Sequence, residues 1–557
     1  MKRIQLNNAL YIFALFIIPI LYFATGVFFQ SELGNYYVGT VDPEFSYLFN
    51  GLNIAQGTLK VWHVDHPGTP LQILAAIVIR VVHLFHGKEP LLDDVLLNTQ
   101  LYVKSIIITL FSLISVSLFV LGYQTNKYSK NIFSGLFLQL IPYSTYVTLA
   151  LMFRINTEHM SILCVVLLMI LLINYFNSPN NNATIFDKYF IWFSVITGFT
   201  IAVKITFLPL FFVPFFLFPG ILKKIYYSVF AFLSFLVFIL PVLIYRFGYF
   251  TDWILKLLNH SGRYGEGEEK VIDKSSYIDA LKQTFTFAPF FTISFIVIIL
   301  ACIIYQFPFV KRSLKNVKYY NALLGVALAI TLQILLIAKQ FTYYYLTPAL
   351  LVSIIGLYLV ITIFLKQTNS SIKNLIYSSL ILCVFYIDYR QVVEHHSENL
   401  QRKEANSKAY NFVQQNHTTK PLLLVPSYYG CPYQEYALYF GLYWGGEKMR
   451  NTYVTVLNKL YPNTIIYEGW DKNFHSWDGS AFSSLDVLKR DRGFRLYSTD
   501  TTVEKNIIAV CNKIKDTKID TLFSNAITHE TVYDITNDSR VLIDLDSLNI
   551  KDINQNK

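Results

Sequence analysis

The chain has 557 residues, of which 54% are hydrophobic and only 15% are charged. Soluble domains carry about a quarter charged residues, so this composition excludes an ordinary soluble protein and indicates a membrane protein. The net charge of +10 does not require a nucleic-acid partner. The lysines and arginines lie in short loops between apolar runs, as in the cytoplasmic loops of membrane proteins.

Apolar runs recur along the first two thirds of the chain and predict an all-α polytopic domain with about eleven transmembrane helices. The runs cover residues 8–29, 102–122, 131–151, 158–176, 189–205, 206–221, 226–245, 285–306, 319–338, 344–365 and 374–389. If the N-terminus is cytoplasmic, cations concentrate in every loop that then faces the cytoplasm. This topology predicts an integral plasma (inner) membrane protein whose C-terminal part is extracytoplasmic.

The first external loop, residues 31–101, contains one more apolar run, LQILAAIVIRVVHLFH at 71–86. The run is short for a span and contains Arg80 and His83. Gln72, Ala76, Arg80, His83 and His86 recur at steps of three and four, so they share one face of a helix. We expect an amphipathic helix lying in the membrane interface, because a further span would invert the cation bias of all later loops.

Residues 391–557 are more polar and predict a separate extracytoplasmic α/β or α+β domain, after a membrane domain at 1–390. The segments PLLLVP, TIIYEG, FRLYS and VLIDLD have the pattern of strands, and TTVEKNIIAVCNKIK has that of a helix with Thr501 and Glu504 as a capping box. Cys431 and Cys511 lie in this part, either as free thiols or as one disulfide. Cys164, Cys302 and Cys383 lie in apolar runs, where cysteine behaves as a small hydrophobe.

Eight ionisable residues share a predicted place in or near the outer half of the membrane: Asp42, Glu44, Asp65, His66, Arg154, Glu158, Lys204 and Lys339. Charges at such depth are costly and tend to mark functional sites. They come from five separate segments that the topology brings to one leaflet. This convergence is the main sequence indication of a site.

Structural alternatives exist for most of these residues. Asp42-Pro43 is also the pattern of a helix start, with the aspartate as N-cap. Arg154 and Glu158 are also spaced for an internal ion pair, and Lys339 for reaching the membrane surface. Tyr343 opens a YYY run that fits an aromatic belt as well as a sugar platform. A divalent metal bound by the His-x-Asp-His segment at 63–66 is a further alternative, without a spacing specific for metal.

The motifs of the first external loop resemble those of the GT-C superfamily of membrane glycosyltransferases. The resemblance rests on Asp42-Pro43-Glu44 after the first span and on Asp65-His66-Pro67-Gly68 before the interfacial helix, and GFTIAVKITFLPL also has a counterpart in that superfamily. The likeness is greatest to the protein O-mannosyltransferase and aminoarabinose-transferase branch (the glycosyltransferase family 39 type). Pro43 between the two acids and Gly68 in place of a second proline are departures that leave the acceptor open.

The resemblance implies a GT-C-like fold, a polyprenyl-phosphate sugar as donor, and inversion at the sugar carbon. A phosphate leaving group departs as an anion, so it needs cations rather than a general acid. We expect Lys204, Arg154 and Lys339 to bind the phosphate. We expect Asp42 to act as the base with Glu44 beside it, and His66, Asp65, Glu158 and Tyr343 to position the acceptor and the loop.

The resemblance implies a lipid, glycan or protein as the acceptor. Alternative functions are a transporter or flippase for lipid-linked glycans and an O-antigen-type polymerase or ligase. A transporter needs polar groups through both leaflets, whereas the inner halves of the predicted spans carry few charges. A polymerase of that type uses a large external loop late in the chain, whereas the long membrane-proximal loop comes first here.

Overall fold

Two structural units make up the computed structural model, which describes residues 2–65, 67–178, 187–262, 265, 267–314, 317–339, 341–427, 429–469, 472–482, 486 and 492–537. The membrane unit contains Met1–Tyr36, Asp42–Gln401 and Phe440–Met449. The sheet unit contains Tyr37–Val41, Arg402–Tyr439 and Arg450–Lys557. The sequence predicted the division after residue 390, and in the structure the main division follows Gln401. In addition, Tyr37–Val41 belongs to the sheet unit although it comes early in the chain, and Phe440–Met449 belongs to the membrane unit although it comes late.

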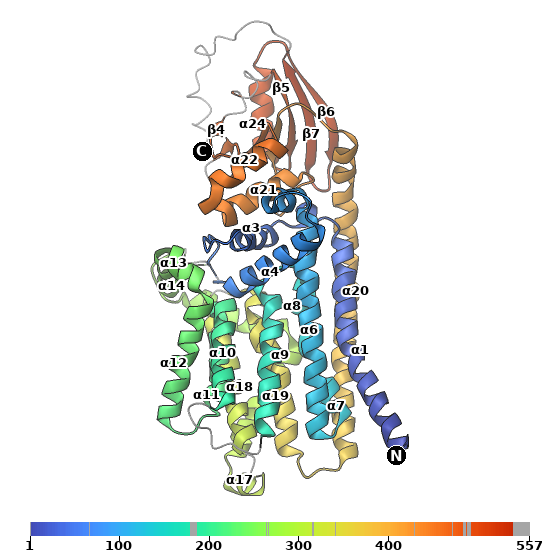
Figure 1. The fold of residues 1–557 in the computed structure, drawn as a ribbon, viewed down its shortest axis with the longest axis vertical. Coiled ribbons are helices and arrows are strands. Elements are labelled where there is room, and N and C mark those ends of the chain that lie inside the picture. The colour runs from blue at the N-terminus through green and yellow to red at the C-terminus, as the bar shows by residue number, and fades with distance from the viewer. Residues whose placement is uncertain are drawn as a thin grey trace. The chain divides into compact units, whose positions relative to one another are not determined.

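Long apolar helices form the membrane unit (Figure 1). Among the described residues, eight helices are long and apolar enough to cross a membrane. They are α1 (Lys2–Leu33), α4 (Thr69–His86), α6 (Thr99–Ser129), α9 (Thr157–Phe176), α12 (Ile221–Phe238), α18 (Val317–Ala338), α19 (Thr347–Phe364) and α20 (Ser370–Gln415). The pair α15 (Lys274–Phe287) and α16 (Pro289–Tyr305), bent by 99°, makes a ninth if it is counted as one span. The polytopic helical fold is confirmed, with eight or nine such helices rather than about eleven.

Prolines account for most of this difference, because proline lacks an N–H donor and clashes with the preceding turn. The predicted span 131–151 is divided into α7 (Ile132–Gln139), η1 (Ile141–Tyr143) and α8 (Tyr146–Leu151), with Pro142 at the break. The predicted span 206–221 contains Pro209 and Pro214, and it forms η2 (Ile205–Phe211) and α11 (Phe212–Phe215). Pro241 begins α13 (Leu240–Tyr245) after α12. The run at 189–205 forms α10 (Lys188–Val203).

The first external loop forms four helices: α2 (Tyr36–Gly39), α3 (Glu44–Ala55), α4 and α5 (Leu91–Leu97). Figure 1 shows α3 and α4 running across the direction of α6, α9 and α10. This is the direction expected of an interfacial helix, although α4 is also long and apolar enough to span. Of the face predicted from the sequence, Gln72 and Ala76 are buried, whereas Arg80 and His86 are exposed. The apolar Leu84 and Phe85 in the last turn are also exposed.

Three shorter helices of the membrane unit lie between spans: α14 (Phe247–Asn259), α17 (Pro308–Leu314) and η4 (Tyr343–Leu346). The π-turn η5 (Leu442–Gly446) and η6 (Glu447–Met449) lie in the later segment Phe440–Met449 of this unit. The chain before α14 turns at Arg246, and η4 leads directly into α19. These connections carry several of the site residues described below.

The sheet unit contains a seven-stranded mixed sheet, as predicted for an α/β or α+β domain. The strand order is β4-β3-β2-β1-β5-β7-β6. The strands are β1 (Leu422–Val425), β2 (Thr464–Glu468), β3 (Asn473–His475), β4 (Ala481–Phe482), β5 (Gly493–Ser498), β6 (Thr517–Asn525) and β7 (Glu530–Asn537). The central strands β2, β1 and β5 are parallel, and the outer pairs are antiparallel. The predicted strand VLIDLD lies outside the described residues.

Among the described residues that follow β1, three helices accompany these strands: α21 (Gln434–Gly441), α22 (Arg450–Leu460) and α24 (Thr501–Asn512). Asp500, not Thr501, caps α24 by accepting from the backbone N–H groups of Thr502 and Val503. The predicted capping box is therefore wrong by one residue. Glu504 instead accepts hydrogen bonds from the hydroxyls of Thr531 and Tyr533.

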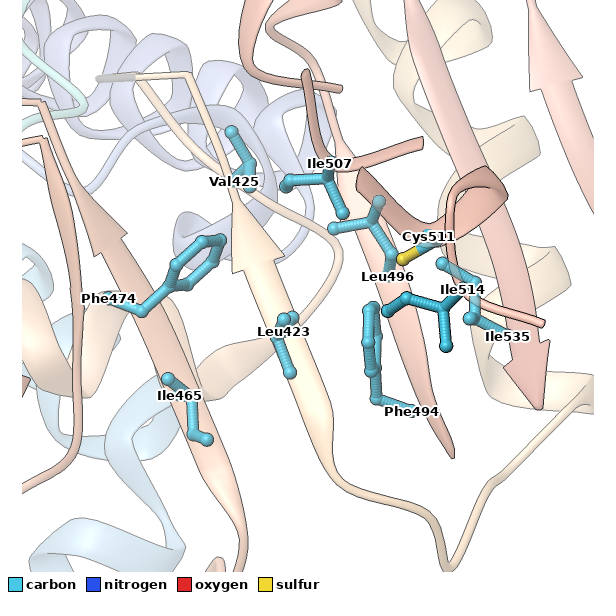
Figure 2. Packing of buried hydrophobic residues seen from close by; sticks show 10 residues of the cluster. All are labelled: Leu423, Val425, Ile465, Phe474, Phe494, Leu496, Ile507, Cys511, Ile514 and Ile535. Atoms are coloured by element: carbon cyan, nitrogen blue, oxygen red, sulfur yellow. The ribbon is translucent and has the colours of Figure 1, made fainter. Parts of the chain in front are cut away.

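A hydrophobic core fills the sheet unit (Figure 2). Its buried members come from the central strands, from β3, β7 and α24, and from Ile514, two residues after α24: Leu423, Val425, Ile465, Phe474, Phe494, Leu496, Ile507, Cys511, Ile514 and Ile535. The alternative of a Cys431–Cys511 disulfide is not observed. Both cysteines are free and buried, and Cys511 packs as a small apolar side chain.

The segment Tyr37–Val41, which precedes Asp42 in sequence, is hydrogen-bonded within the sheet unit. The Val41 N–H donates to the carbonyl of Tyr429 and the Cys431 N–H donates to the carbonyl of Tyr37, both at 2.9 Å. Gly430 lies so close that a Cβ there would be 2.5 Å from the carbonyl oxygen of Val38. Only a glycine permits this approach.

Candidate active site

Glu44 is fully buried at the first position of α3 and is paired with Arg154 from the turn before α9. The Arg154 Nε donates to Glu44 Oε1 at 2.9 Å and Nη2 donates to Oε2 at 3.1 Å. Nη2 also donates to the carbonyl oxygen of Asp42. This bidentate pair fixes the backbone at Asp42 relative to α9, because two parallel hydrogen bonds define both distance and orientation.

Asp42 is half-buried directly before α3. The N-cap position of α3 is occupied by Pro43, and Asp42 is the residue before it. The peptide bond between Asp42 and Pro43 is cis. The helix start is therefore one residue later than the alternative with Asp42 as N-cap, and the Asp42 carboxylate acts electrostatically on Arg154 of the Glu44–Arg154 pair.

Glu158 and Lys204 form a second ion pair, which is almost completely buried. Their side chains are 8% and 2% exposed. Glu158 lies in the first turn of α9, and Lys204 lies in the extended residue between α10 and η2. The predicted break at Lys204 is confirmed, whereas the alternative pair Arg154–Glu158 is wrong because each residue has another partner.

The Lys204 ammonium also contacts aromatic rings of η4. Its Nζ lies 4.2 Å from the ring centre of Tyr345 and 5.5 Å from that of Tyr344. The backbone of Lys204 forms a β-bridge with Pro67 of the Asp-His-Pro-Gly motif. One lysine thus joins the first external loop, α9, α10 and η4.

The hydroxyl of Tyr47 lies near three carboxylates of this region. Tyr47 is fully buried in α3, and burial raises the pKa of its hydroxyl, as do the carboxylates of Glu158, Asp42 and Asp65 in that order. All three acids are therefore close enough to act on one hydroxyl, which remains protonated and able to donate a hydrogen bond.

The Tyr47 hydroxyl also explains the glycine at position 68. Gly68 has φ +69°, a value closed to proline, and a Cβ there would be 2.7 Å from the Tyr47 hydroxyl oxygen. The second proline of the family motif is thus incompatible with the backbone at this position.

Arg246 is a residue of this region that the sequence interpretation missed. Its guanidinium lies 3.4 Å from the ring centre of Trp62 and 4.2 Å from that of Tyr249. Its buried Nε has no hydrogen-bond partner in the part of the chain that the structure describes. Asp65 acts electrostatically on both Arg246 and Tyr249. A signal existed: Arg246 follows the apolar run 226–245 on the predicted outer side, where cations are rare.

Two other predicted residues have contacts away from the ion pairs. Lys339 donates to the carbonyl oxygens of Leu257 and Leu258 at 2.5 and 2.8 Å, so it interacts with the last turn of α14. Tyr343 is 43% exposed and stacks on Phe287 at 5.9 Å. The neighbouring Tyr344 and Tyr345, not Tyr343, contact Lys204.

His66 lies outside the described residues, so its predicted role is neither supported nor contradicted. Among the residues that are described, no group of three or more histidine, cysteine, aspartate or glutamate side chains is arranged to hold a metal ion. We therefore derive no metal-dependent step.

The arrangement has two electrostatically different parts. Around Tyr47, the carboxylates of Glu158, Asp42 and Asp65 act on one hydroxyl, and Lys204 and Arg154 are the cations paired with Glu158 and Glu44. Around Trp62, Arg246 faces Asp65. The first part is suited to accept a proton, and the second offers guanidinium donors to an anion.

No protein-family model and no curated relative matches the sequence. Two solved structures of ArnT from Cupriavidus metallidurans are similar to this structure, one in the apo state with a TM-score of 0.49 and one bound to undecaprenyl phosphate with a TM-score of 0.47. Each is 9% identical in sequence, and the similarity covers 92% of this chain and 97% of ArnT.

Proposed function

We propose that this protein is an inverting glycosyltransferase of the membrane, which moves a sugar from a polyprenyl-phosphate donor to an acceptor hydroxyl. The observation that carries the proposal is the pair of buried salt bridges, Glu44–Arg154 and Glu158–Lys204, beside the half-buried Asp42. Buried charges are costly unless they are paired, so two such pairs at one place indicate a site that needs fixed charge.

The proposal includes an orientation. The N-terminus is cytoplasmic, the first external loop and the sheet unit are extracytoplasmic, and the reaction takes place at the outer face of the plasma membrane. The cation-rich loops of the sequence support this sidedness.

In the proposed reaction, the acceptor hydroxyl oxygen attacks the anomeric carbon of the sugar. The bond between that carbon and the phosphate oxygen breaks, and the phosphate leaves with the electron pair. The acceptor proton passes to the Asp42 carboxylate, which acts as general base. No general acid is needed, because the leaving phosphate is already an anion. One displacement inverts the configuration at the sugar carbon.

Glu44 and Arg154 have positioning roles in this scheme. Arg154 holds Glu44 through two hydrogen bonds and the Asp42 carbonyl through a third. The base is thereby kept at a fixed place, which is what proximity catalysis requires.

We assign the donor phosphate to Arg246 and Lys204. Arg246 has a buried Nε without a hydrogen-bond partner among the described residues, and Lys204 supplies a second cation beside the acids. Arg154 and Lys339, which the sequence also suggested for the phosphate, remain proposed ligands; like Lys204, each already donates to a protein acceptor. Asp65, Glu158, His66 and Tyr343 remain proposed positioning groups for the loop and acceptor.

The test uses the full-length protein in nanodiscs with a panel of polyprenyl-phosphate sugars and lipid, glycan and protein acceptors. Native protein transfers a sugar, and Asp42→Asn lowers kcat about 10²- to 10⁴-fold, the usual contribution of a general base. Asp279→Asn is the matched control, since Asp279 is 64% exposed in a surface pair with Lys282. Equal kcat for Asp42→Asn and native protein contradicts the base assignment, and no transfer from any donor contradicts the proposed function.

A further inference from the structure

Trp62 carries two cations on one indole ring. The Arg246 guanidinium is 3.4 Å from the ring centre, and the Lys448 Nζ is 5.1 Å from the same point. The two positive charges are therefore no farther apart than the sum of these distances. Lys448 was not a candidate from the sequence, because it lies 386 residues after Trp62.

Lys448 reaches this place because the segment Phe440–Met449 packs on α3 within the membrane unit. The Asn53 amide donates to the carbonyl of Gly445 at 2.8 Å, and the Asn50 amide donates to that of Trp444 at 3.3 Å. A Cβ at Gly445 would be 2.6 Å from the Phe49 Cβ, so the backbone of the segment lies directly against the helix. The close packing fixes the segment that carries Lys448.

The same asparagine fixes the indole from the other side. The Asn50 Oδ1 accepts from the backbone N–H groups of Trp62 at 2.7 Å and His63 at 3.3 Å. Asn50 is fully buried and uses both ends of its amide in these contacts. One side chain therefore joins the backbone at Trp62 to the backbone at Trp444, four residues before Lys448.

The two cations differ in their surroundings: the Arg246 Nε is buried without a hydrogen-bond partner among the described residues, and Lys448 is exposed to solvent. Asp65 is the carboxylate that acts on Arg246, and it also acts on Tyr249. No salt bridge to Lys448 or Arg246 occurs among the described residues. An anion at this ring would therefore meet one guanidinium N–H without an acceptor in the described part of the chain and one accessible ammonium group.

We propose that Arg246 and Lys448 together bind one anionic oxygen group of the phosphate class at Trp62. The inference deepens the proposed function, since the group belongs either to the lipid-phosphate donor or to an anionic acceptor. The segment Phe440–Met449 is then part of the substrate site, although it follows the sheet unit's first strand in sequence.

Binding, not turnover, tests this site. The affinities of inorganic phosphate and of undecaprenyl phosphate are measured by calorimetry with the full-length protein in nanodiscs. Lys448→Gln weakens binding of at least one probe on the order of tenfold, as expected for loss of one charge-assisted contact. Lys448→Arg stays within about twofold of native affinity. Lys505→Gln is the control, an equal charge loss at an exposed position of α24.

The two probes distinguish the sources of the anion. Parallel weakening for both probes assigns the site to the donor phosphate, and weakening for inorganic phosphate alone assigns it to the acceptor. Unchanged affinity for both probes in Lys448→Gln overturns the proposal, as does an equal loss in Lys505→Gln. Failure of the proposed function is a different result: the native protein would transfer no sugar. The binding measurements do not depend on sugar transfer, so the two failures can be distinguished.

Discussion

Removing one member of the buried Glu158–Lys204 pair is expected to destabilise the membrane unit strongly. Lys204→Met leaves the Glu158 carboxylate buried without its partner, and such uncompensated charges cost about 3–5 kcal/mol. Lys204 also loses its contact with the Tyr345 ring at 4.2 Å, which contributes about 1–2 kcal/mol when shielded from water. We expect the free energy of unfolding to fall by about 5 kcal/mol in total, because methionine still packs against the ring and retains part of that contact.

Glu158→Gln is expected to cost less, because Lys204 keeps the aromatic rings and an amide oxygen as partners. In the double variant no charge remains unpaired. Its loss should therefore be smaller than the sum of the single losses by about 2 kcal/mol or more.

The assay is unfolding of the four proteins in mixed micelles by titration with sodium dodecyl sulfate, followed by circular dichroism. A coupling free energy within experimental error of zero refutes the reasoning, because it means that the two side chains do not compensate each other. The surface pair Asp279–Lys282 provides the matched cycle. Its side chains are 64% and 71% exposed, so its coupling should not exceed about 1 kcal/mol.

Three further outcomes follow from the structure. Arg246→Lys should raise the donor KM more than it lowers kcat, because lysine lacks the planar stack on Trp62; an unchanged KM in steady-state assays argues against that contact. Asp500→Ala should destabilise the sheet unit by about 1 kcal/mol in thermal unfolding, since α24 loses its N-cap, and no shift would contradict the cap. Burial raises the pKa of Glu530 in the folded protein above its ordinary value of 4.5. Its contribution to the free energy of unfolding is therefore complete below pH 4.5, and it is lost as the pH rises through the pKa of the folded state. Glu530→Gln should therefore flatten the fall in stability above pH 4.5, and an unchanged pH profile would refute this.

The sequence predicted the helical membrane fold and the position of its most costly charges, because hydrophobicity and buried ionisable groups are both visible in a single chain. It did not predict where apolar runs break. Pro142, Pro209 and Pro214 divide runs that are otherwise apolar enough to span. Hydropathy averages over such residues, whereas each removes a backbone hydrogen bond.

The partners of the buried ion pairs could not be predicted from the sequence for another reason. Arg154 and Glu158 are four residues apart, so local spacing favours a pair, yet each binds a residue from a distant segment. Partners such as Glu44 and Lys204 are selected by the packing of helices. Arg246 and Lys448 were missed because the aromatic ring they share belongs to a loop with no regular pattern.

The reciprocal placement of two short segments affects how this protein can be divided or recombined. Tyr37–Val41 is hydrogen-bonded inside the sheet unit, and Phe440–Met449 lies inside the membrane unit. A truncation after Gln401 would deprive Asn50 and Asn53 of the carbonyls of Trp444 and Gly445. Each half of the chain therefore depends on a short segment from the other half. A chimera that takes its C-terminal half from a homologue must also take the residues that contact these two segments from that homologue.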